Sequence, residues 1–266
     1  MTGPAPAVSV LMAVRDGAPW VREAVESVLA QTAGDLELIV IDDGSTDATL
    51  AVLEAVRDPR LRVERREGQG LTRALNRALG LARAPLVARL DADDLALPER
   101  LARQRDFLDA HPEVGLLGTA AREVDALGRE VRVVRPPQHD AALRRALIRE
   151  NPFVHSSVML RRALCEQAGG YDEAFPVAQD YDLWMRMSRA TRLANLDDVL
   201  VVRRLLPGRI SVEREGDRLR TEARVRWEAI RRGDYPWWCV VHALRPTAAL
   251  ALPPALRRGL RIALGR

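Results

Sequence analysis

The segment VSVLMAVRDGAPWVREAVESVLAQTAGDLELIVIDDGS, residues 8–45, decides the fold of this chain. Two short apolar runs, residues 8–14 and 36–41, have the length of buried strands. Between them, apolar side chains recur at the spacing of one helical face: Trp20, Ala24, Val25, Val28 and Leu29. A strand, a helix and a second strand of these lengths form a βαβ unit with parallel strands. The segment therefore predicts an α/β protein.

The same alternation continues along the chain. We predict a helix over residues 48–57, a strand over 61–65, a helix over 71–82 and a strand over 85–90. These segments complete one half of a doubly wound sheet. In such a sheet a ligand binds in the loops that follow the carboxyl ends of the strands.

The second half of the chain predicts mixed strand pairing. Pro98 is well placed to begin a helix over residues 98–109, and a strand at 113–118 leads into a hairpin that turns near Gly128. The remaining elements follow in order: a helix over 140–149, a strand, a helix closed by Gly169 and Gly170, a helix that begins near Asp180, and a strand over 199–205.

Charge is divided unevenly between the body of the chain and its carboxyl-terminal extension. Residues 1–200 carry 26 Arg and 31 acidic residues, whereas residues 201–266 carry 15 Arg and 6 acidic residues. The extension predicts a helix over 214–232 rich in Arg and Glu, followed by apolar segments that three prolines separate: Pro246, Pro253 and Pro254. A basic extension suits an anionic lipid surface or nucleic acid.

Cysteine usage and hydropathy indicate the compartment. The two cysteines, Cys165 and Cys239, are far apart in sequence and do not suggest a disulfide framework or a zinc site. The chain opens without a basic and apolar leader, and it has no run of about 18 uncharged apolar residues. We therefore expect a cytoplasmic protein that does not span a membrane.

Two carboxylates, Asp42 and Asp43, follow the second predicted strand directly. In one interpretation they belong to a turn, in which Gly44 relaxes the backbone and a side chain of residues 45–47 caps the next helix. In the other, one carboxylate accepts a hydrogen bond from the N–H of a nucleobase, which selects an imide-bearing pyrimidine. The residues alone leave both interpretations open.

Asp91, Asp93 and Asp94 are crowded at the end of the strand over 85–90. A position near a helix amino terminus stabilises a carboxylate by about 0.3–1 kcal/mol, which is too little to explain three of them there. Mg²⁺ or Mn²⁺ is a better explanation, because each binds one or two carboxylates together with phosphate oxygens and water. We expect Asp94 to orient the loop or cap the next helix, and the loop to be poorly held until a cation and a diphosphate bind.

Five segments resemble, in order and spacing, glycosyltransferase family 2, which has the GT-A fold. They cover residues 8–32, 36–49, 70–79, 88–101 and 179–186. The resemblance spans about residues 7–205 and implies a Rossmann-like, mixed and mainly parallel sheet flanked by helices. It divides the chain into a catalytic domain and an extension, with these bounds: domain 1–210, nucleotide-sugar half 7–97, acceptor half 98–210, basic helical extension 211–266.

The family resemblance implies an inverting enzyme that uses a nucleoside-diphosphate sugar, usually uridine-based, and a divalent metal. The acceptor would be a hydroxyl on a sugar, a lipid-linked glycan or another molecule, in the synthesis of cell-surface polysaccharide or glycolipid. Carried over by position, Asp42 or Asp43 contacts the base, Asp91 contacts the ribose or a metal-bound water, and Asp93 binds the metal. The donor side would also include Ala13, Arg15, Arg73 and Ala92.

The same resemblance makes Asp180 the general base. An inverting transfer needs one carboxylate that takes the acceptor hydroxyl proton as the oxygen attacks. Asp182 is the competing candidate, and an N-cap is the alternative role for Asp180. Gln179, Trp184 and His155 fall on the acceptor side, although a Trp at helical spacing is as often a core residue.

Four departures from the family pattern are visible. Arg15 occupies the slot of an aromatic residue near the base, Gln179 replaces a Glu before the general base, and Gly68 replaces an Asn. A guanidinium also stacks on a base, but uridine preference is then less secure. The loop at 205–209 lacks a His. The diphosphate would then be bound by one of these other side chains: Arg203, Arg204, Arg209 or His155.

Other functional classes fit less well. A sugar nucleotidyltransferase should carry a Gly-rich, Arg-containing loop after the first strand, which residues 13–19 do not supply. A nucleic-acid-binding protein needs aromatic side chains in a basic groove, whereas Arg and Glu interleave over residues 214–232. An inactive nucleotide-sugar-binding subunit remains an alternative. For the segment around Trp237 and Trp238, peripheral contact with a membrane and packing on the catalytic domain are both open.

Overall fold

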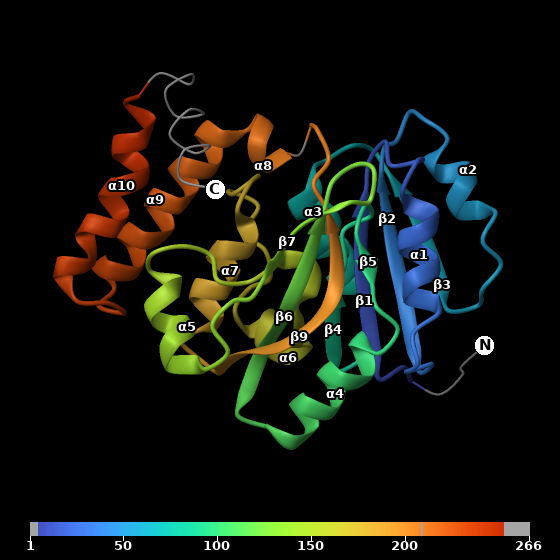
Figure 1. The fold of residues 1–266 in the computed structure, drawn as a ribbon, viewed down its shortest axis with the longest axis horizontal. Coiled ribbons are helices and arrows are strands. Elements are labelled where there is room, and N and C mark those ends of the chain that lie inside the picture. The colour runs from blue at the N-terminus through green and yellow to red at the C-terminus, as the bar shows by residue number, and fades with distance from the viewer. Residues whose placement is uncertain (1–4, 209, 253–266) are drawn as a thin grey trace.

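The computed structural model describes residues 5–208 and 210–252 (Figure 1). The first half contains β1 (Val8–Val14), α1 (Val21–Leu29), β2 (Leu36–Asp43), α2 (Thr49–Glu54), β3 (Leu61–Arg66), α3 (Leu71–Leu81), β4 (Leu86–Arg89), β5 (Leu95–Ala96) and α4 (Arg100–Ala110). The second half contains β6 (Val114–Val124), β7 (Glu130–Val134), α5 (Asp140–Leu147), the 3₁₀ turn η1 (His155–Ser157), β8 (Met159–Arg161), α6 (Arg162–Gln167), α7 (Gln179–Met187), β9 (Arg192–Arg204), α8 (Ile210–Glu213), α9 (Glu215–Arg231), the 3₁₀ turn η2 (Trp237–Cys239) and α10 (Val240–Leu250).

The described strands form one mixed sheet in the order β3-β2-β1-β4-β8-β6-β9-β5, with β7 paired to β6. Strands β3, β2, β1 and β4 are mutually parallel, and β6 is parallel to β9. Strand β8 joins the two parallel groups because it is antiparallel to both β4 and β6. The parallel first half brings the carboxyl ends of β1, β2 and β4 to one edge, where the candidate site lies.

Helices cover both faces of the sheet, so that successive residues of a strand enter different cores. In β1, Leu11 and Ala13 pack against α3 and α7, whereas Val10 and Met12 pack against α1 and α4. Every residue of β1 and β2 is buried. This burial explains why both strands are almost continuous apolar runs.

Most predicted elements are confirmed within one or two residues, including the βαβ unit and the hairpin at Gly128, where φ is +76°. Four details differ from the expectations. Strand β9 begins at Arg192, seven residues before the strand predicted over 199–205. Helix α4 begins at Arg100, because Pro98 lies in a preceding turn. The short strand β5, which pairs with β9, has no pattern that predicts it. Pro246 does not interrupt α10 but lies inside it. Pro253 and Pro254 lie outside the described residues.

The extension divides into a packed helix and an outer one. Helix α9 places Val225 and Ala229 in the core that contains α3 and α7. The Arg226 side chain is also buried and donates to the Tyr181 hydroxyl at 3.0 Å. Helix α9 therefore packs on the catalytic domain, and α10 lies outside it at the far end of the molecule from α2 (Figure 1).

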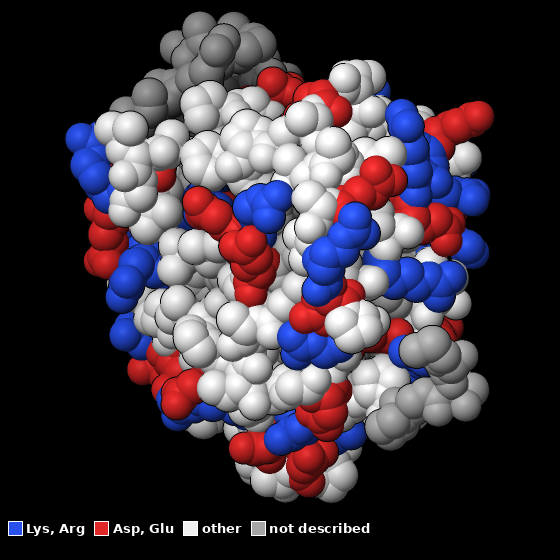
Figure 2. All heavy atoms as spheres, turned by 90° about the vertical axis from the view of Figure 1, so that its right-hand side faces the viewer, with Lys and Arg blue, Asp and Glu red and all other residues white. Residues whose placement is uncertain are grey.

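Charged side chains of both signs are interspersed over the face near α2 (Figure 2). Ion pairs of the first half of the chain include Arg22–Glu26 and Arg77–Glu64. None of the described helices is both long and apolar enough to cross a membrane.

Candidate active site

The loops after β1, β2 and β3 converge at two glycines. A side chain at Gly44 would place its Cβ 2.7 Å from the Gly68 backbone nitrogen, and a Cβ at Gly68 would lie 2.9 Å from the Arg15 guanidinium. Gly44 also has a φ of +76°, which favours glycine. Arg15 and Gly68, two of the departures from the family pattern, are therefore in direct contact. The guanidinium fits there because residue 68 has no side chain.

Asp42 and Asp43 have different surroundings. The two oxygens of Asp43 accept the backbone N–H groups of Gln69 and Gly70, both at 2.8 Å, and so fix the loop after β3. Asp42 is completely buried, and one of its oxygens accepts the Ser45 N–H at 3.1 Å. The other has no hydrogen-bond partner in the described structure and lies 3.8 Å from Arg65 Nε. Only Asp42 therefore keeps an unused acceptor.

The turn interpretation of this segment is confirmed. Asp47 accepts the backbone N–H of Thr49 at 2.9 Å, where α2 begins. It also accepts the Ala18 N–H at 3.1 Å, which ties the loop after β1 to that after β2. Asp16, which has a positive φ of 51°, accepts the Thr46 N–H at 2.7 Å. The donor-side loops are thus linked to one another before any ligand is bound.

The three acids after β4 form one cluster. One carboxylate oxygen from each of Asp91, Asp93 and Asp94 lies within 4.8 Å of the others. Burial, with repulsion from the neighbouring carboxylates, raises the pKa of Asp93 to about 6 and that of Asp94 to about 7. Burial also opposes ionisation of Asp91, but the charge of Arg89 holds its pKa well below the usual value. The repulsion inferred from the sequence is therefore present.

The loop of acids nevertheless has partners within the chain, which corrects the expectation that it is poorly held without a cation. Arg89, at the end of β4, forms an ion pair with Asp91. The Ser156 hydroxyl contacts both Asp91, at 2.8 Å, and Asp94. From β9, the Arg204 backbone N–H donates to Asp94 at 2.8 Å and its guanidinium donates to the Asp93 carbonyl at 3.0 Å.

These contacts give the three acids different roles. Asp94 is buried and bonded through both oxygens, so it orients the loop, and it does not cap α4. Asp91 is held by Arg89 and Ser156. No other described residue donates a hydrogen bond to the Asp93 carboxylate, which keeps its oxygens open. Asp93 is therefore the acid of the cluster most available to a ligand.

Asp180 lies in the first turn of α7. This helix begins directly after Ala178, whose backbone has a positive φ of 57°. Non-glycine residues with such a backbone concentrate at functional sites. The Asn151 side chain donates to Asp180 Oδ2 at 2.7 Å. Burial raises the pKa of Asp180, although this hydrogen bond and the charge of Arg89 oppose the rise. The competing candidate, Asp182, is instead tied to Arg186 through an ion pair at 2.6 Å.

Two other residues of the acceptor-side prediction lie in the interior. Trp184 is completely buried and packs edge-on against Phe153 and His155, which is the core role that the sequence left open. His155 Nε2 lies 3.0 Å from the Tyr171 hydroxyl. Burial and the nearby Arg89 hold the pKa of His155 well below its usual value, so that it is neutral at physiological pH.

The remaining predicted residues have varied positions. Ala13 is buried near the end of β1, Ala92 is half-buried in the acidic loop, and Gln179 is buried at the start of α7. Arg73, on α3, pairs with Glu173 at 2.9 Å. Arg203 pairs with Glu123 at 2.7 Å and Arg204 with Glu23. Arg209 lies outside the described residues.

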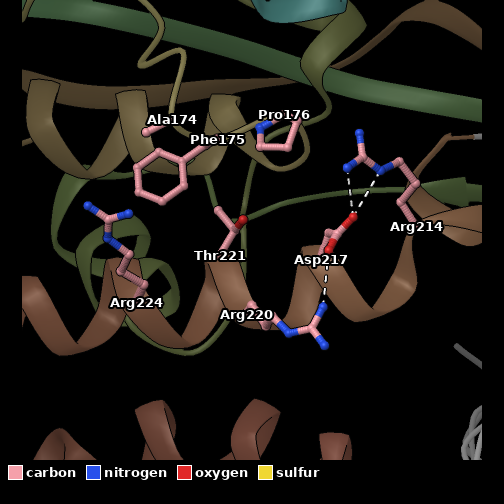
Figure 3. A pocket seen from close by; sticks show the side chains of 8 residues that line it. All are labelled: Ala174, Phe175, Pro176, Arg214, Asp217, Arg220, Thr221 and Arg224. Carbon is pink, nitrogen blue, oxygen red and sulfur yellow. Dashed lines mark hydrogen bonds and ion pairs between the residues drawn. The ribbon is translucent and has the colours of Figure 1, made fainter.

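A cavity of about 220 Å³ lies between α9 and the loop that leads to Asp180 (Figure 3). Phe175 forms one wall, and the Arg224 guanidinium lies 4.8 Å from its ring centre. On the other side, Asp217 is paired with both Arg214 and Arg220. The loop itself is fixed to α3, since the Thr72 hydroxyl donates to the Phe175 carbonyl at 2.9 Å.

Three residues of the site escaped the sequence analysis: Arg89, Ser156 and Asn151. Arg89 left a signal, since it is the one charged residue in the apolar strand over 85–90, and buried charges require a partner. Ser156 and Asn151 left none. They lie 65 and 29 residues from the acids that they contact, Asp91 and Asp180, so only the folded chain brings each pair together.

The sheet order, with an acidic cluster after β4, defines the GT-A class of glycosyltransferase folds. The chain belongs to glycosyltransferase family 2, whose family model matches residues 9–169. The amylovoran biosynthesis glycosyltransferase AmsE of Erwinia amylovora is 35% identical over 183 residues, which are 67% of this chain and 68% of AmsE. The O-antigen biosynthesis glycosyltransferase WbnJ of Escherichia coli is 30% identical over 68% of this chain and 71% of WbnJ.

Solved structures agree on the fold. TarS 1–349 of S. aureus superposes with a TM-score of 0.69 at 21% identity, over 97% of this chain and 79% of TarS. The mannosyltransferase PcManGT of Pyrobaculum calidifontis, solved with GDP-Man and Mn²⁺, gives a TM-score of 0.67 at 23% identity, over 98% of this chain and 79% of PcManGT. At these identities the likeness establishes the fold.

The buried Arg89 should contribute much more to stability than a surface arginine does. We predict that Arg89→Met lowers the free energy of unfolding by about 2–3 kcal/mol, less than a fully buried pair would because Asp91 is partly exposed. Arg22→Met, which breaks an exposed pair with Glu26, should cost less than about 1 kcal/mol. Urea unfolding of both variants measures the difference, and equal losses would contradict the role of Arg89.

Proposed function

We propose that this protein is a metal-dependent inverting glycosyltransferase that moves a sugar from a nucleoside-diphosphate sugar to a hydroxyl acceptor. One observation carries the proposal: Asp93 keeps an open carboxylate in a braced acidic loop, while a partly buried Asp180, held by Asn151, lies within the influence of the same Arg89 charge. By analogy with AmsE and WbnJ, the product would belong to a cell-surface polysaccharide.

The residues of the acidic cluster fit a divalent cation. Carboxylate oxygens are the ligands that Mg²⁺ and Mn²⁺ prefer, and three acids here lie close enough to share one ion. We assign Asp93 as a direct ligand and Asp91 as a ligand to the metal or to its water, because Arg89 keeps Asp91 ionised. When bound, the cation would neutralise charge on the departing diphosphate.

Asp180 would accept the proton of the acceptor hydroxyl as that oxygen attacks the anomeric carbon. The nucleoside diphosphate leaves from the opposite face of the sugar, so the configuration at this carbon is inverted. Burial makes Asp180 a stronger base than an exposed carboxylate, and the hydrogen bond from Asn151 to one of its oxygens orients the carboxylate.

For the donor base, we propose contact with the unpaired oxygen of Asp42 and stacking on Arg15. Burial of Asp42 means that Arg65 would have to shift to admit the base. Uracil is the first candidate because its N–H matches this acceptor. Guanine offers an N–H as well, and the structural neighbours include TarS with UDP-GlcNAc and PcManGT with GDP-Man.

The first experiment is a panel of UDP-, GDP- and dTDP-sugars, each tested with and without Mn²⁺ by thermal unfolding. We expect one nucleotide class to raise the melting temperature by about 5 °C at saturating concentration, and only with the metal present. The chelated protein is the matched control. If no donor stabilises the protein in a metal-dependent way, the proposed activity is wrong.

Two substitutions separate donor binding from proton transfer. Asp93→Asn should weaken metal-dependent donor binding and lower turnover by about 100-fold or more. Asp180→Asn should leave donor binding intact and lower turnover by about 10²–10⁴-fold. Asp106→Asn, an exposed acid on α4, is the control and should change neither quantity. Near-normal turnover of Asp180→Asn would mean that the base lies elsewhere, or that the protein only binds the donor.

The pH profile tests the base assignment independently. Transfer needs ionised Asp180, so activity should fall as the pH drops through the raised pKa of this group. The Asn151 hydrogen bond favours the ionised form, and a bond to a charged group is worth about 1.5–3 kcal/mol. Asn151→Ala should therefore move the acid limb of kcat upward by about one to two pH units. Asp182→Asn should leave the limb in place; the reverse pattern would assign the base to Asp182.

A further inference from the structure

The outermost helix of the protein exposes an apolar surface, which we call the α10 surface. It contains Trp237 and Trp238 of η2, with 77% and 62% of their areas exposed, and Val241 and Leu244 of α10, with 53% and 55% exposed. Single exposed apolar residues are common, but four large ones within eight positions are not. Packing among the described residues does not explain why these apolar side chains are exposed.

The helix has two apolar faces, of which only one is used inside the protein. Ala243 and Pro246 are buried on the face toward α9. Val241, Leu244 and Ala248 are spaced three and four residues apart, and they form an exposed stripe on the opposite side of the helix. Arg245 is the one charged residue of α10 and is also exposed. A surface helix normally carries charged residues on its outer face.

Cationic side chains lie close to α10. Burial, together with the nearby Arg149, Arg245 and Arg226, lowers the pKa of His242, which lies in the first turn of the helix. Asp234 is the last acidic residue of the sequence, and Arg189 and Arg232 pair with it. Among the described residues after Asp234, Arg245 is the one Asp, Glu, Lys or Arg residue. The surface therefore offers apolar and cationic groups together.

We propose that the α10 surface docks the protein on an anionic lipid bilayer. Trp side chains are favoured at the level of the headgroups, the Val241 and Leu244 stripe enters the acyl boundary, and arginines contact anionic headgroups. A second copy of the chain fits less well. A two-fold contact through this surface would bring the same arginines together without an acidic partner.

Flotation of the full chain with two kinds of vesicle tests the proposal. One kind is pure phosphatidylcholine, and the other contains about one-third phosphatidylglycerol. We expect the protein to float with the anionic vesicles alone, and its Trp emission to shift to shorter wavelength. Trp237→Ser combined with Trp238→Ser should reduce the floated fraction at least about fivefold, and Arg245→Glu should also reduce it.

The matched control is Leu127→Ser in the β6–β7 hairpin, because Leu127 is as exposed as Trp237, at 77%. It should float like the unchanged protein. All three variants alter exposed side chains, and circular dichroism checks that each one is folded. Flotation that is absent, that is equal with neutral vesicles, or that survives loss of both Trp residues would overturn the proposal. A dimer that the Trp substitutions dissociate, without flotation, would assign the surface to a second copy.

Discussion

The ion pair between Arg89 and Asp91 is the interaction on which the site depends. Strand β4 carries the guanidinium into the interior, where it is almost completely buried. Its charge lowers the pKa of Asp91, opposes the rise in the pKa of Asp180 and adds to the effect of burial in lowering the pKa of His155. One cation of the protein thus compensates the acidic cluster and also acts on the candidate base. The acids are crowded because this charge offsets part of their repulsion before any metal arrives.

The same arrangement explains why the site is largely formed without a donor. Ser156, Arg204 and Arg89 come from three different elements and hold the acidic loop from three directions. Only Asp93 is left without such a partner, so that metal binding need not break an existing contact of that side chain. Sites whose groups are held in place lose less entropy when the ligand binds. The acidic loop is therefore preorganised for the proposed metal ion.

The sequence predicts the first half of the fold well because the strands there are buried on both faces and the helices are amphipathic. Buried positions in such elements are occupied by apolar residues at a regular local spacing, and β1, α1 and β2 show this pattern clearly. The sequence also predicts where Asp93 and Asp180 lie in the fold, because Asp93 follows strand β4 and Asp180 lies at the start of helix α7. It does not predict their partners, because Ser156 and Asn151 belong to irregular segments whose place depends on the whole sheet. Strand β5 depends likewise on β9, which is about 100 residues away.

The contact between Arg15 and Gly68 shows how departures from a family pattern are coupled in space. A side chain at position 68 would collide with the guanidinium. A side chain at position 68 would therefore require Arg15 to take another position. Both residues belong to the loops that contain or contact Asp42 and Asp43, so the two departures lie together at the proposed base-binding end of the site.

Helix α9 of the carboxyl-terminal extension supports the catalytic domain. Arg226 on α9 donates to the Tyr181 hydroxyl, and Tyr181 is the residue after Asp180. Val225 and Ala229 pack in the same core as Leu183 and Trp184, so α9 supports the helix that carries the candidate base. Removal of the whole extension would therefore disturb the site as well as the α10 surface. Helix α10 covers α9 with one face only. Substitutions on its other face therefore test the proposed attachment to a membrane separately from catalysis, which a truncation cannot do.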